Sequence, residues 1–427
     1  MKPVPKWMVS AWFTFFLLTV PRVADADMPT VQDLFVTDVT TVSFSVIWAA
    51  SEASTADLEV YEDAAGTIPV TGATIVPHPV NNGDAAIRLA AEDNGVMKVM
   101  VTGLSYDTTY YFRTLTTSKS TIETAVYPAT GLLDVTTEVR TVRTYESNGD
   151  ILPFSNDVII EPCYLEDGVT PATGTLLMAT VAGANYPLTA FVGDGVPSPN
   201  ALIDLNNAFS RQFFENIDLY DGENLTLLNF GGLSGNSVVN KRTPLDNSLA
   251  EIKPAAAGLN EGWNFVALQL EPNVTELVQF FGEEFVKVDA VWAYDGATSI
   301  WSKYKEYDPF NTNDLTDVHA QVGYWVDIAA GEQSSLKIFG NMVNNSSVAL
   351  YTGWNLIGYS AFMEADLMDA ISPITSYVDA VWSFEGDIGW EKYKTYDPFN
   401  TNNLEVLKPG KAYWVYVNAD CDFPVGQ

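Results

Sequence analysis

The chain has 427 residues, of which 47% are hydrophobic and 18% are charged. This composition excludes a disordered chain, because disordered chains lack the apolar residues that form a core, and the length exceeds that of one ordinary domain. Asp and Glu number 54 against 21 Lys and Arg, and the formal net charge of −33 argues against nucleic acid and anionic membranes as partners.

Residues 1–26 are predicted to be a Sec signal peptide. A basic start at Lys2 and Lys6 is followed by an apolar run, Trp7–Val20, and by small residues that predict cleavage after Ala26. The apolar run is shorter than the ~20 residues that a membrane span needs, which argues against an anchor. The mature protein is therefore expected to be secreted or held at the cell surface, with no integral membrane segment.

Residues 27–140 are predicted to form a β-sandwich. Apolar and polar residues alternate along Val42–Ala49, which is typical of a half-buried strand. The stretch Gly103–Arg113 resembles the fibronectin type III signature, in which a Gly-Leu pair precedes Thr-x-Tyr and an aromatic strand. The resemblance implies a seven-stranded sandwich in which Tyr110 is the corner tyrosine and Trp48 is a core tryptophan.

The connection 64–95 in this first module is unusually long, and we expect an extended loop or an extra hairpin there. Residues 141–250 are predicted to form a second β-sandwich, because β-branched and aromatic runs alternate with Gly, Pro, Asn and Asp clusters. Within it, apolar residues recur at helical spacing over Ala201–Phe214, which predicts a short helix. The two cysteines, Cys163 and Cys421, lie in different modules, and the sequence leaves their pairing open.

The C-terminal half contains an internal duplication. Four motifs recur in the same order at nearly constant offsets, which chance does not produce. They begin at Gly262 and Gly353, at Val288 and Val378, at Tyr307 and Tyr396, and at Tyr324 and Tyr413. We therefore predict two tandem α+β modules, residues 258–342 and 343–427, called here the first and second repeats.

Each repeat is expected to contain strands and one amphipathic helical stretch, Val274–Phe281 or Ala365–Ile371. The motifs resemble a Gly-Trp-Asn…Tyr-Trp repeat found at the C-termini of bacterial and archaeal surface proteins. The resemblance implies an extracellular setting and no known activity. The whole chain is thus predicted to be mainly β and multi-domain, with two β-sandwiches followed by two tandem α+β repeat modules.

The tryptophans of the repeats are the first candidate site. Eight of the 11 tryptophans lie there, and such side chains either stack on sugar rings or fill the cores of small modules. Both interpretations remain open from the sequence. The aromatic residues expected in loops form the candidate ligand platform: Trp301, Tyr304, Trp390 and Tyr393.

Clustered Asp and Asn side chains in each repeat are the second candidate site. Their oxygens suit Ca²⁺, although the spacing does not fit an EF-hand and the same residues also build turns without a metal. No other cofactor is predicted. The candidate ligands are Asp308, Asn311 and Asn313 in the first repeat, and Asp397, Asn400 and Asn402 in the second.

No catalytic residues are predicted. The two histidines, His78 and His319, lie in different modules, and the sequence lacks a nucleophile elbow, a phosphate loop and zinc-ligand spacing. We expect a non-catalytic structural or adhesive protein of the cell surface or extracellular matrix, or the subunit of a self-assembling filament. Its expected partners are itself, other surface proteins or extracellular polysaccharide. A carbohydrate-binding protein that uses the loop aromatics is the first alternative, and a secreted hydrolase is the second.

Overall fold

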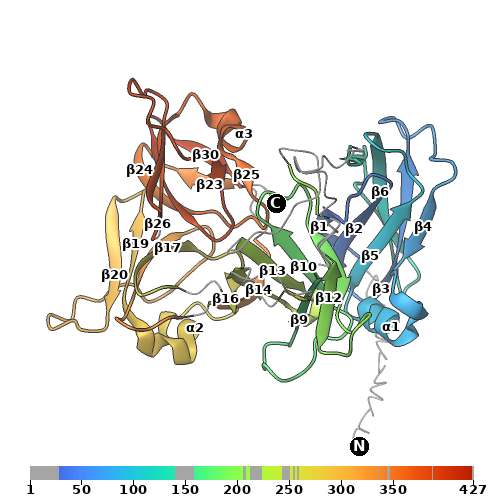
Figure 1. The fold of residues 1–427 in the computed structure, drawn as a ribbon, viewed down its shortest axis with the longest axis horizontal. Helices are drawn as coiled ribbons and strands as arrows, with labels where there is room; N and C mark the ends of the chain where they lie inside the picture. The colour runs from blue at the N-terminus through green and yellow to red at the C-terminus, as the bar shows by residue number, and fades with distance from the viewer. Residues whose placement is uncertain are drawn as a thin grey trace, which may run out of the picture.

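The computed structural model describes residues 28–139, 158–204, 208–211, 224–242, 251–252, 255–256, 259–334, 336–343, 347–386 and 388–425. The predicted signal peptide lies outside these residues. The chain is mainly β with several antiparallel sheets, as expected. Figure 1 shows the first module on the right, the second module in the centre and the two repeats on the left, one above the other. None of the helices in the described ranges is long and apolar enough to cross a membrane.

The first module has two β-sheets that enclose a common core. One sheet has the order β1-β2-β5-β4, and in the other β6 pairs with β3, β7 and β8. Trp48 is fully buried between the sheets, and its indole N–H donates to the Thr116 hydroxyl at 2.9 Å. The Tyr110 hydroxyl accepts the Ser105 N–H at 2.9 Å, which is the contact expected of a corner tyrosine. The strands are β1 (Val31–Thr37), β2 (Ser43–Ala50), β3 (Ser54–Tyr61), β4 (Thr74–Pro77), β5 (Val96–Thr102), β6 (Thr109–Ser118), β7 (Thr124–Tyr127) and β8 (Leu133–Thr136).

The long connection in this module contains a helix that the sequence analysis missed. Besides β4, it forms α1 (Ala85–Asp93), which begins where the Asp84 carboxylate accepts the N–H groups of Ala86 and Ile87. Ile87 on this helix is buried in a cluster that also contains residues of the second module. The helical part of the connection therefore packs against the second module.

The second module contributes β-strands to two sheets. One has the order β12-β9-β15, and the other begins β11-β10-β13-β14. The helix expected over Ala201–Phe214 is wrong where the structure describes it, because Asn200–Asp204 forms β12 and pairs with β9, and Ser210 forms a β-bridge with Ala184. Residues 205–207 and 212–214 lie outside the described residues. Cys163 and Cys421 are both free, and burial raises the pKa of the Cys163 thiol to about 12. The strands are β9 (Val158–Pro162), β10 (Leu176–Val181), β11 (Leu188–Phe191), β12 (Asn200–Asp204), β13 (Asn224–Phe230), β14 (Asn236–Arg242), β15 (Glu251–Ile252) and β16 (Ala255–Ala256).

The two repeats have the same four-stranded antiparallel sheet, ordered β17-β21-β19-β20 in the first and β24-β29-β26-β27 in the second. The predicted helical stretches contain α2 (Leu277–Phe281) and α3 (Leu367–Ile371). The first repeat has β17 (Gly262–Ala267), β18 (Glu271–Pro272), β19 (Val288–Asp295), β20 (Ile300–Lys305), β21 (Gly323–Ile328) and β22 (Lys337–Asn341). The second has β23 (Ser347–Leu350), β24 (Gly353–Gly358), β25 (Ala365–Asp366), β26 (Val378–Glu385), β27 (Gly389–Lys394), β28 (Val406–Leu407), β29 (Ala412–Val417) and β30 (Cys421–Pro424).

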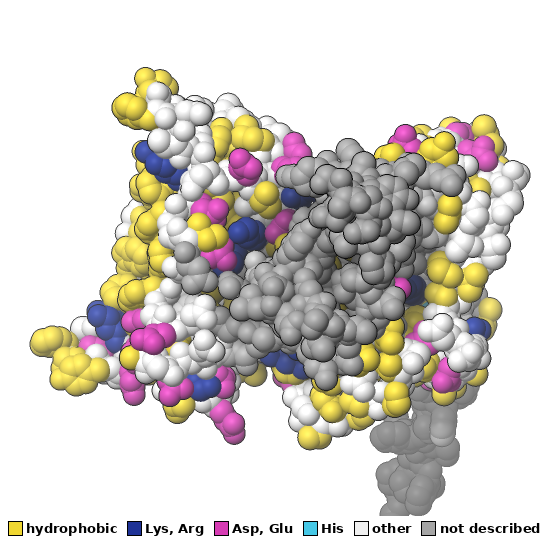
Figure 2. All heavy atoms as spheres, viewed as in Figure 1, with side chains coloured by type: hydrophobic (Ala, Val, Ile, Leu, Met, Phe, Trp, Pro, Cys, Tyr) yellow, Lys and Arg dark blue, Asp and Glu magenta, His cyan; other side chains and the backbone are white. Residues whose placement is uncertain are grey.

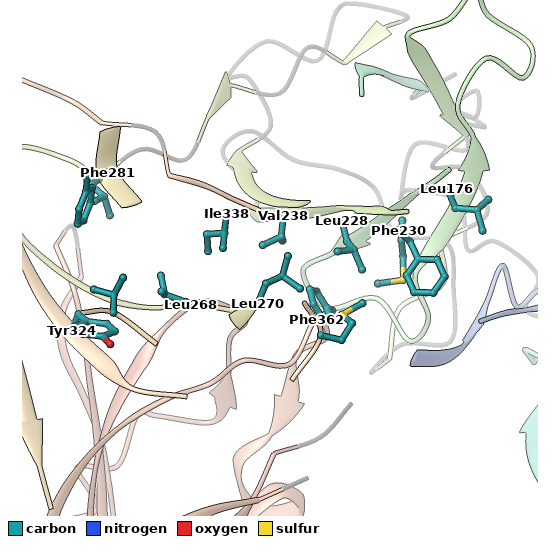
Figure 3. Packing of buried hydrophobic residues seen from close by; sticks show 14 of the residues in the cluster. Leu176, Leu228, Phe230, Val238, Leu268, Leu270, Phe281, Tyr324, Ile338 and Phe362 are labelled. Carbon is teal, nitrogen blue, oxygen red and sulfur yellow. The ribbon is translucent and has the colours of Figure 1, made fainter. Parts of the chain in front are cut away.

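The second module and the first repeat share one sheet and one core. Strand β22 of the repeat pairs with β14, and β18 pairs with β22, so the sheet continues past the expected boundary near residue 257. Figure 3 shows the shared core as a row of side chains that runs from Phe281 and Tyr324 through Ile338 and Val238 to Phe230. The two units are therefore held in a fixed relative position by apolar burial.

Asp33 gives the first module a pH-dependent stability. Burial raises the pKa of this carboxyl to about 6, so its charged form opposes folding. The stability that the protonated carboxyl contributes is fully present below the unfolded pKa near 4 and is lost as the pH rises through about 6. We expect Asp33→Asn to raise the free energy of unfolding at pH 7 by about 1–2 kcal/mol, allowing for solvent screening of the partly exposed carboxyl.

Denaturant unfolding of both proteins at pH 4 and pH 7 measures this effect. The variant should gain stability at pH 7 and little at pH 4. Asn also tolerates the positive φ of 51° at this position, so the substitution adds no backbone strain. An equal gain at both pH values would contradict the assignment.

Candidate functional site

Strand alternation gives each repeat sheet one core face and one aromatic face. In β19, Val291 is buried in the core, and Trp292, one residue further, points to the opposite face. Cross-strand pairing places Trp325 and Lys303 on either side of Trp292. The aromatic face of the first repeat contains Trp263, Phe265, Trp292, Tyr294, Trp301 and Trp325.

The second repeat has the same aromatic face. Trp382 in β26 is paired with Trp414 of β29 and with Lys392 of β27, as Trp292 is paired in the first repeat. The face contains Trp354, Trp382, Phe384, Trp390, Trp414 and Tyr416.

Part of each aromatic face is packed against the other repeat. The Trp325 ring lies 5.4 Å from Phe384 and 5.8 Å from Trp390, and Trp414 lies 5.2 Å from Tyr294 and 5.6 Å from Trp301. These edge-to-face and tilted arrangements are the geometries that aromatic pairs prefer. The duplication thus produces an internal pair of repeats that bury one end of both faces.

The remainder of the first face forms an open groove, called here the first groove, with a volume of about 740 Å³. Trp263 is 44% exposed and Trp301 is 41% exposed, while Trp292 and Trp325 lie between them and are less accessible. Figure 2 shows hydrophobic side chains along the left edge of the molecule, between two protruding loops. The lining residues are Trp263, Asp289, Ala290, Trp292, Trp301, Lys305, Glu306, Tyr307, Trp325 and Asp327.

Charged groups border the first groove. The ammonium groups of Lys303 and Lys305 lie 5.6 and 5.2 Å from the centre of the Trp292 ring, within the range of a cation–π interaction. The pKa of the Asp327 carboxyl is raised, mainly by burial and to a smaller extent by the neighbouring Asp289 charge. The groove therefore combines exposed aromatic faces with hydrogen-bonding groups of both charges.

The structure separates the predicted platform into two parts. Trp301 and Trp390 lie in strands β20 and β27 rather than in loops, and they reach the aromatic faces. Tyr304 and Tyr393 are three residues further along the same strands and therefore point to the opposite, core faces. Tyr304 packs 4.9 Å from Phe285, between ring centres.

Trp263 and Trp354 are groove residues that the sequence analysis left out of the platform. They belong to the repeated Gly-Trp-Asn motif, which the sequence analysis used to recognise the duplication. The 41% exposure of Trp354 matches that of Trp301. A sequence signal was available, because neighbouring residues of a strand point to opposite faces, so the tryptophan and the asparagine of this motif lie on different faces. In the structure, the Asn355 side-chain amide donates a hydrogen bond to the Tyr351 carbonyl at 2.7 Å.

The predicted calcium ligands lie in the two protruding loops and take part in loop hydrogen bonds. The Asp308 carboxylate accepts the N–H groups of Phe310 and Thr312, and the Asn313 side chain accepts from the Lys305 N–H at 2.9 Å. Asn311 adopts a φ of 51°, which asparagine tolerates. Asp397, Asn400 and Asn402 repeat these features in the second loop.

No group of three or more His, Cys, Asp and Glu side chains suited to a metal ion occurs in the described ranges. Turn formation accounts for the Asp and Asn residues that the two loops share, without a cation. Calcium binding stays a prediction of the sequence.

The two histidines have separate environments. His78 is buried, and burial lowers its pKa to about 4, so it is neutral at physiological pH. His319 is exposed and its Nδ1 lies 2.7 Å from a Glu271 carboxylate oxygen.

No protein-family model matches the chain, and no curated protein matches it. The structure therefore provides the only description of the class of protein. It is a mainly β protein with two repeat sheets, whose aromatic faces are partly buried against each other and partly exposed.

Proposed function

We propose that this chain is a non-catalytic, secreted adhesive protein that binds polysaccharide on the aromatic faces of its C-terminal repeats. The observation that carries the proposal is the first groove, where two half-exposed tryptophans, Trp263 and Trp301, border a polar rim. Export is inferred from residues 1–26 of the sequence.

The mixed lining of the groove favours a saccharide over an apolar partner. A pyranose ring has faces of C–H groups that pack on aromatic rings, and it has hydroxyl groups around its edge. Asp289, Glu306 and Lys305 are placed to hydrogen-bond with hydroxyl groups. An apolar peptide would instead cover these charged groups without pairing them, which costs free energy.

The duplication suits the adhesive part of the proposal. Two aromatic surfaces on one chain allow two contacts with a polysaccharide matrix, and once one surface is bound, the second contact forms at a high effective concentration. Filament assembly stays a prediction of the sequence. Strands β20 and β27 lie at the edges of their sheets and carry two lysines each, and such charges oppose pairing with strands of another copy.

Substitution of the exposed tryptophans tests the proposal. We expect the full chain to be retarded in affinity electrophoresis by at least one soluble polysaccharide among dextran, galactan, xylan and mannan. Trp263→Ala combined with Trp354→Ala should weaken that binding about tenfold or more, because each stacked ring contributes about 1 kcal/mol beyond its buried area.

Tyr106→Ala is the matched control, because Tyr106 is an exposed aromatic residue of the first module, away from the repeats. It should leave retardation unchanged. Thermal unfolding of each variant checks that the fold is retained. The proposal fails if no polysaccharide of the panel retards the protein, or if the double variant binds as the parent does.

A further inference from the structure

The two aromatic surfaces differ in charge although their aromatic residues correspond. Trp354 packs edge-to-face on Trp414 at 6.1 Å and 88°, as Trp263 packs on Trp325 at 6.2 Å and 85°. Trp382 and Trp390 lie 5.9 Å apart, the same separation as Trp292 and Trp301. The exposed part of the second face, which we call the second surface, consists of Trp354, Trp382, Trp390, Lys392, Lys394 and Tyr416.

Both surfaces retain their two lysines. Lys392 and Lys394 lie 5.9 and 5.3 Å from the Trp382 ring centre, as Lys303 and Lys305 lie beside Trp292. The positive charge is therefore the same in both repeats.

Three of the four carboxylates near the first groove have neutral counterparts in the second repeat. Asp327 stands opposite Trp263 in the strand register, and Tyr416 stands opposite Trp354 at the same position. The Tyr416 ring packs 5.1 Å from Trp354, so an aromatic contact replaces a charge.

Two further carboxylates of the first repeat have neutral counterparts. Glu306 donates its backbone N–H to the Asp289 carbonyl, and Thr395 makes the same bond to Asp379. Asp314 accepts the Lys303 N–H at 2.7 Å, and Asn403 accepts the Lys392 N–H at 2.9 Å.

Only Asp379 remains among the counterparts of these carboxylates, and the Asn418 side-chain amide donates a hydrogen bond to it at 3.2 Å. In the first groove, by contrast, Asp289, Glu306 and Asp327 oppose the two lysines. The local charge therefore changes sign between the repeats, within a chain whose overall charge is strongly negative.

We propose, building on the polysaccharide function above, that the two surfaces select different saccharides. The second surface binds sugars that carry an anionic group, a carboxylate or a sulfate, which Lys392 and Lys394 recognise. The first groove binds neutral sugars, because Asp289 and Asp327 repel an anion. One chain would then crosslink an acidic polymer to a neutral one.

Single-surface variants of the full chain test the proposal. Trp263→Ala leaves the second surface intact, and Trp354→Ala leaves the first groove intact. Each variant is titrated with two matched probe pairs, methyl-esterified polygalacturonate with polygalacturonate and dextran with dextran sulfate. The two members of a pair share one backbone and differ in the anionic group, and the two pairs distinguish a carboxylate from a sulfate.

The Trp263→Ala variant should bind the acidic member of at least one pair about fivefold or more tightly than the neutral member at low salt. That preference should disappear in 0.5 M NaCl, where exposed charges are screened, and on Lys394→Gln. The Trp354→Ala variant should show the reverse preference or none, and Asp327→Asn in that background should improve binding of the acidic probe.

The possible failures are distinguishable. Binding by both variants with the same ratio of acidic to neutral probe would overturn this inference and leave the polysaccharide function standing. Absence of binding to all four probes by the parent and by both variants, with unchanged melting temperatures, would overturn this inference, and absence of binding to the whole neutral panel as well would overturn the polysaccharide function.

Discussion

Asp38→Ala is expected to lower the free energy of unfolding by about 3–5 kcal/mol. The Asp38 carboxylate lies 3.0 Å from the Lys98 ammonium group, in an interface between the first and second modules where the two side chains are only 23% and 10% exposed. It also accepts the backbone N–H and the hydroxyl of Thr189, at 2.8 and 2.5 Å. Removal of the carboxylate leaves a buried ammonium group without its counter-ion, which is the costly outcome.

Arg113→Ala is the matched control for this prediction. Arg113 forms an ion pair with Glu59 in the same module, but both side chains are 37% exposed. Solvent screens such an exposed pair, so the control should change stability little. Urea unfolding of the three proteins provides the comparison, and similar losses for both substitutions would show that Asp38 does not hold the modules together.

Gly358→Val is expected to destabilise the pair of repeats by about 3 kcal/mol or more, because the clash involves backbone that cannot relax easily. A Cβ atom at Gly358 would lie 2.7 Å from both the Ala267 Cβ and the Val322 carbonyl oxygen. The same residue donates its N–H to the Gln321 carbonyl at 2.8 Å. The substitution forces the repeats apart and exposes the aromatic faces to water.

Two measurements follow the effect at Gly358. The melting temperature should fall, and quenching of tryptophan fluorescence by acrylamide should increase as Trp325 and Trp414 lose their cover. Gly386→Ala is the control, since no atom lies within 4 Å of the Cβ position at that glycine. A valine variant with parental quenching would mean that the two faces are not packed as described.

Sequence patterns were sufficient for features that depend on near neighbours. The motif duplication predicted two modules of the same kind, and the two repeats contain sheets with the same strand order. The helices α2 and α3 lie inside the predicted helical stretches. The helix α1 was missed because Pro, Gly and Asn are frequent in the connection around it, although Asp84 and the following alanines provide a cap and a helix start. At β12 a period of two was mistaken for helical spacing.

The candidate site was only partly predictable for a different reason. Sequence composition identified tryptophan as the relevant residue type and identified Trp301 and Trp390. It could not place Trp263 on the same surface as Trp301, because those residues lie on strands at opposite edges of the sheet and meet only through β19 and β21. It also placed Tyr304 with Trp301, although an odd separation along a strand puts them on opposite faces.

The sequence by itself determined the repeated modules, the acidic charge and the presence of two equivalent sets of tryptophans, because these depend on residue type and on spacing along the chain. Only the tertiary structure decided which parts of the aromatic faces are buried and which stay accessible. That outcome depends on the close approach of the two sheets at Gly323 and Gly358, where the absence of a side chain allows contact between segments far apart in sequence. Burial of a ring is a property of its neighbours in space, and local spacing does not encode them.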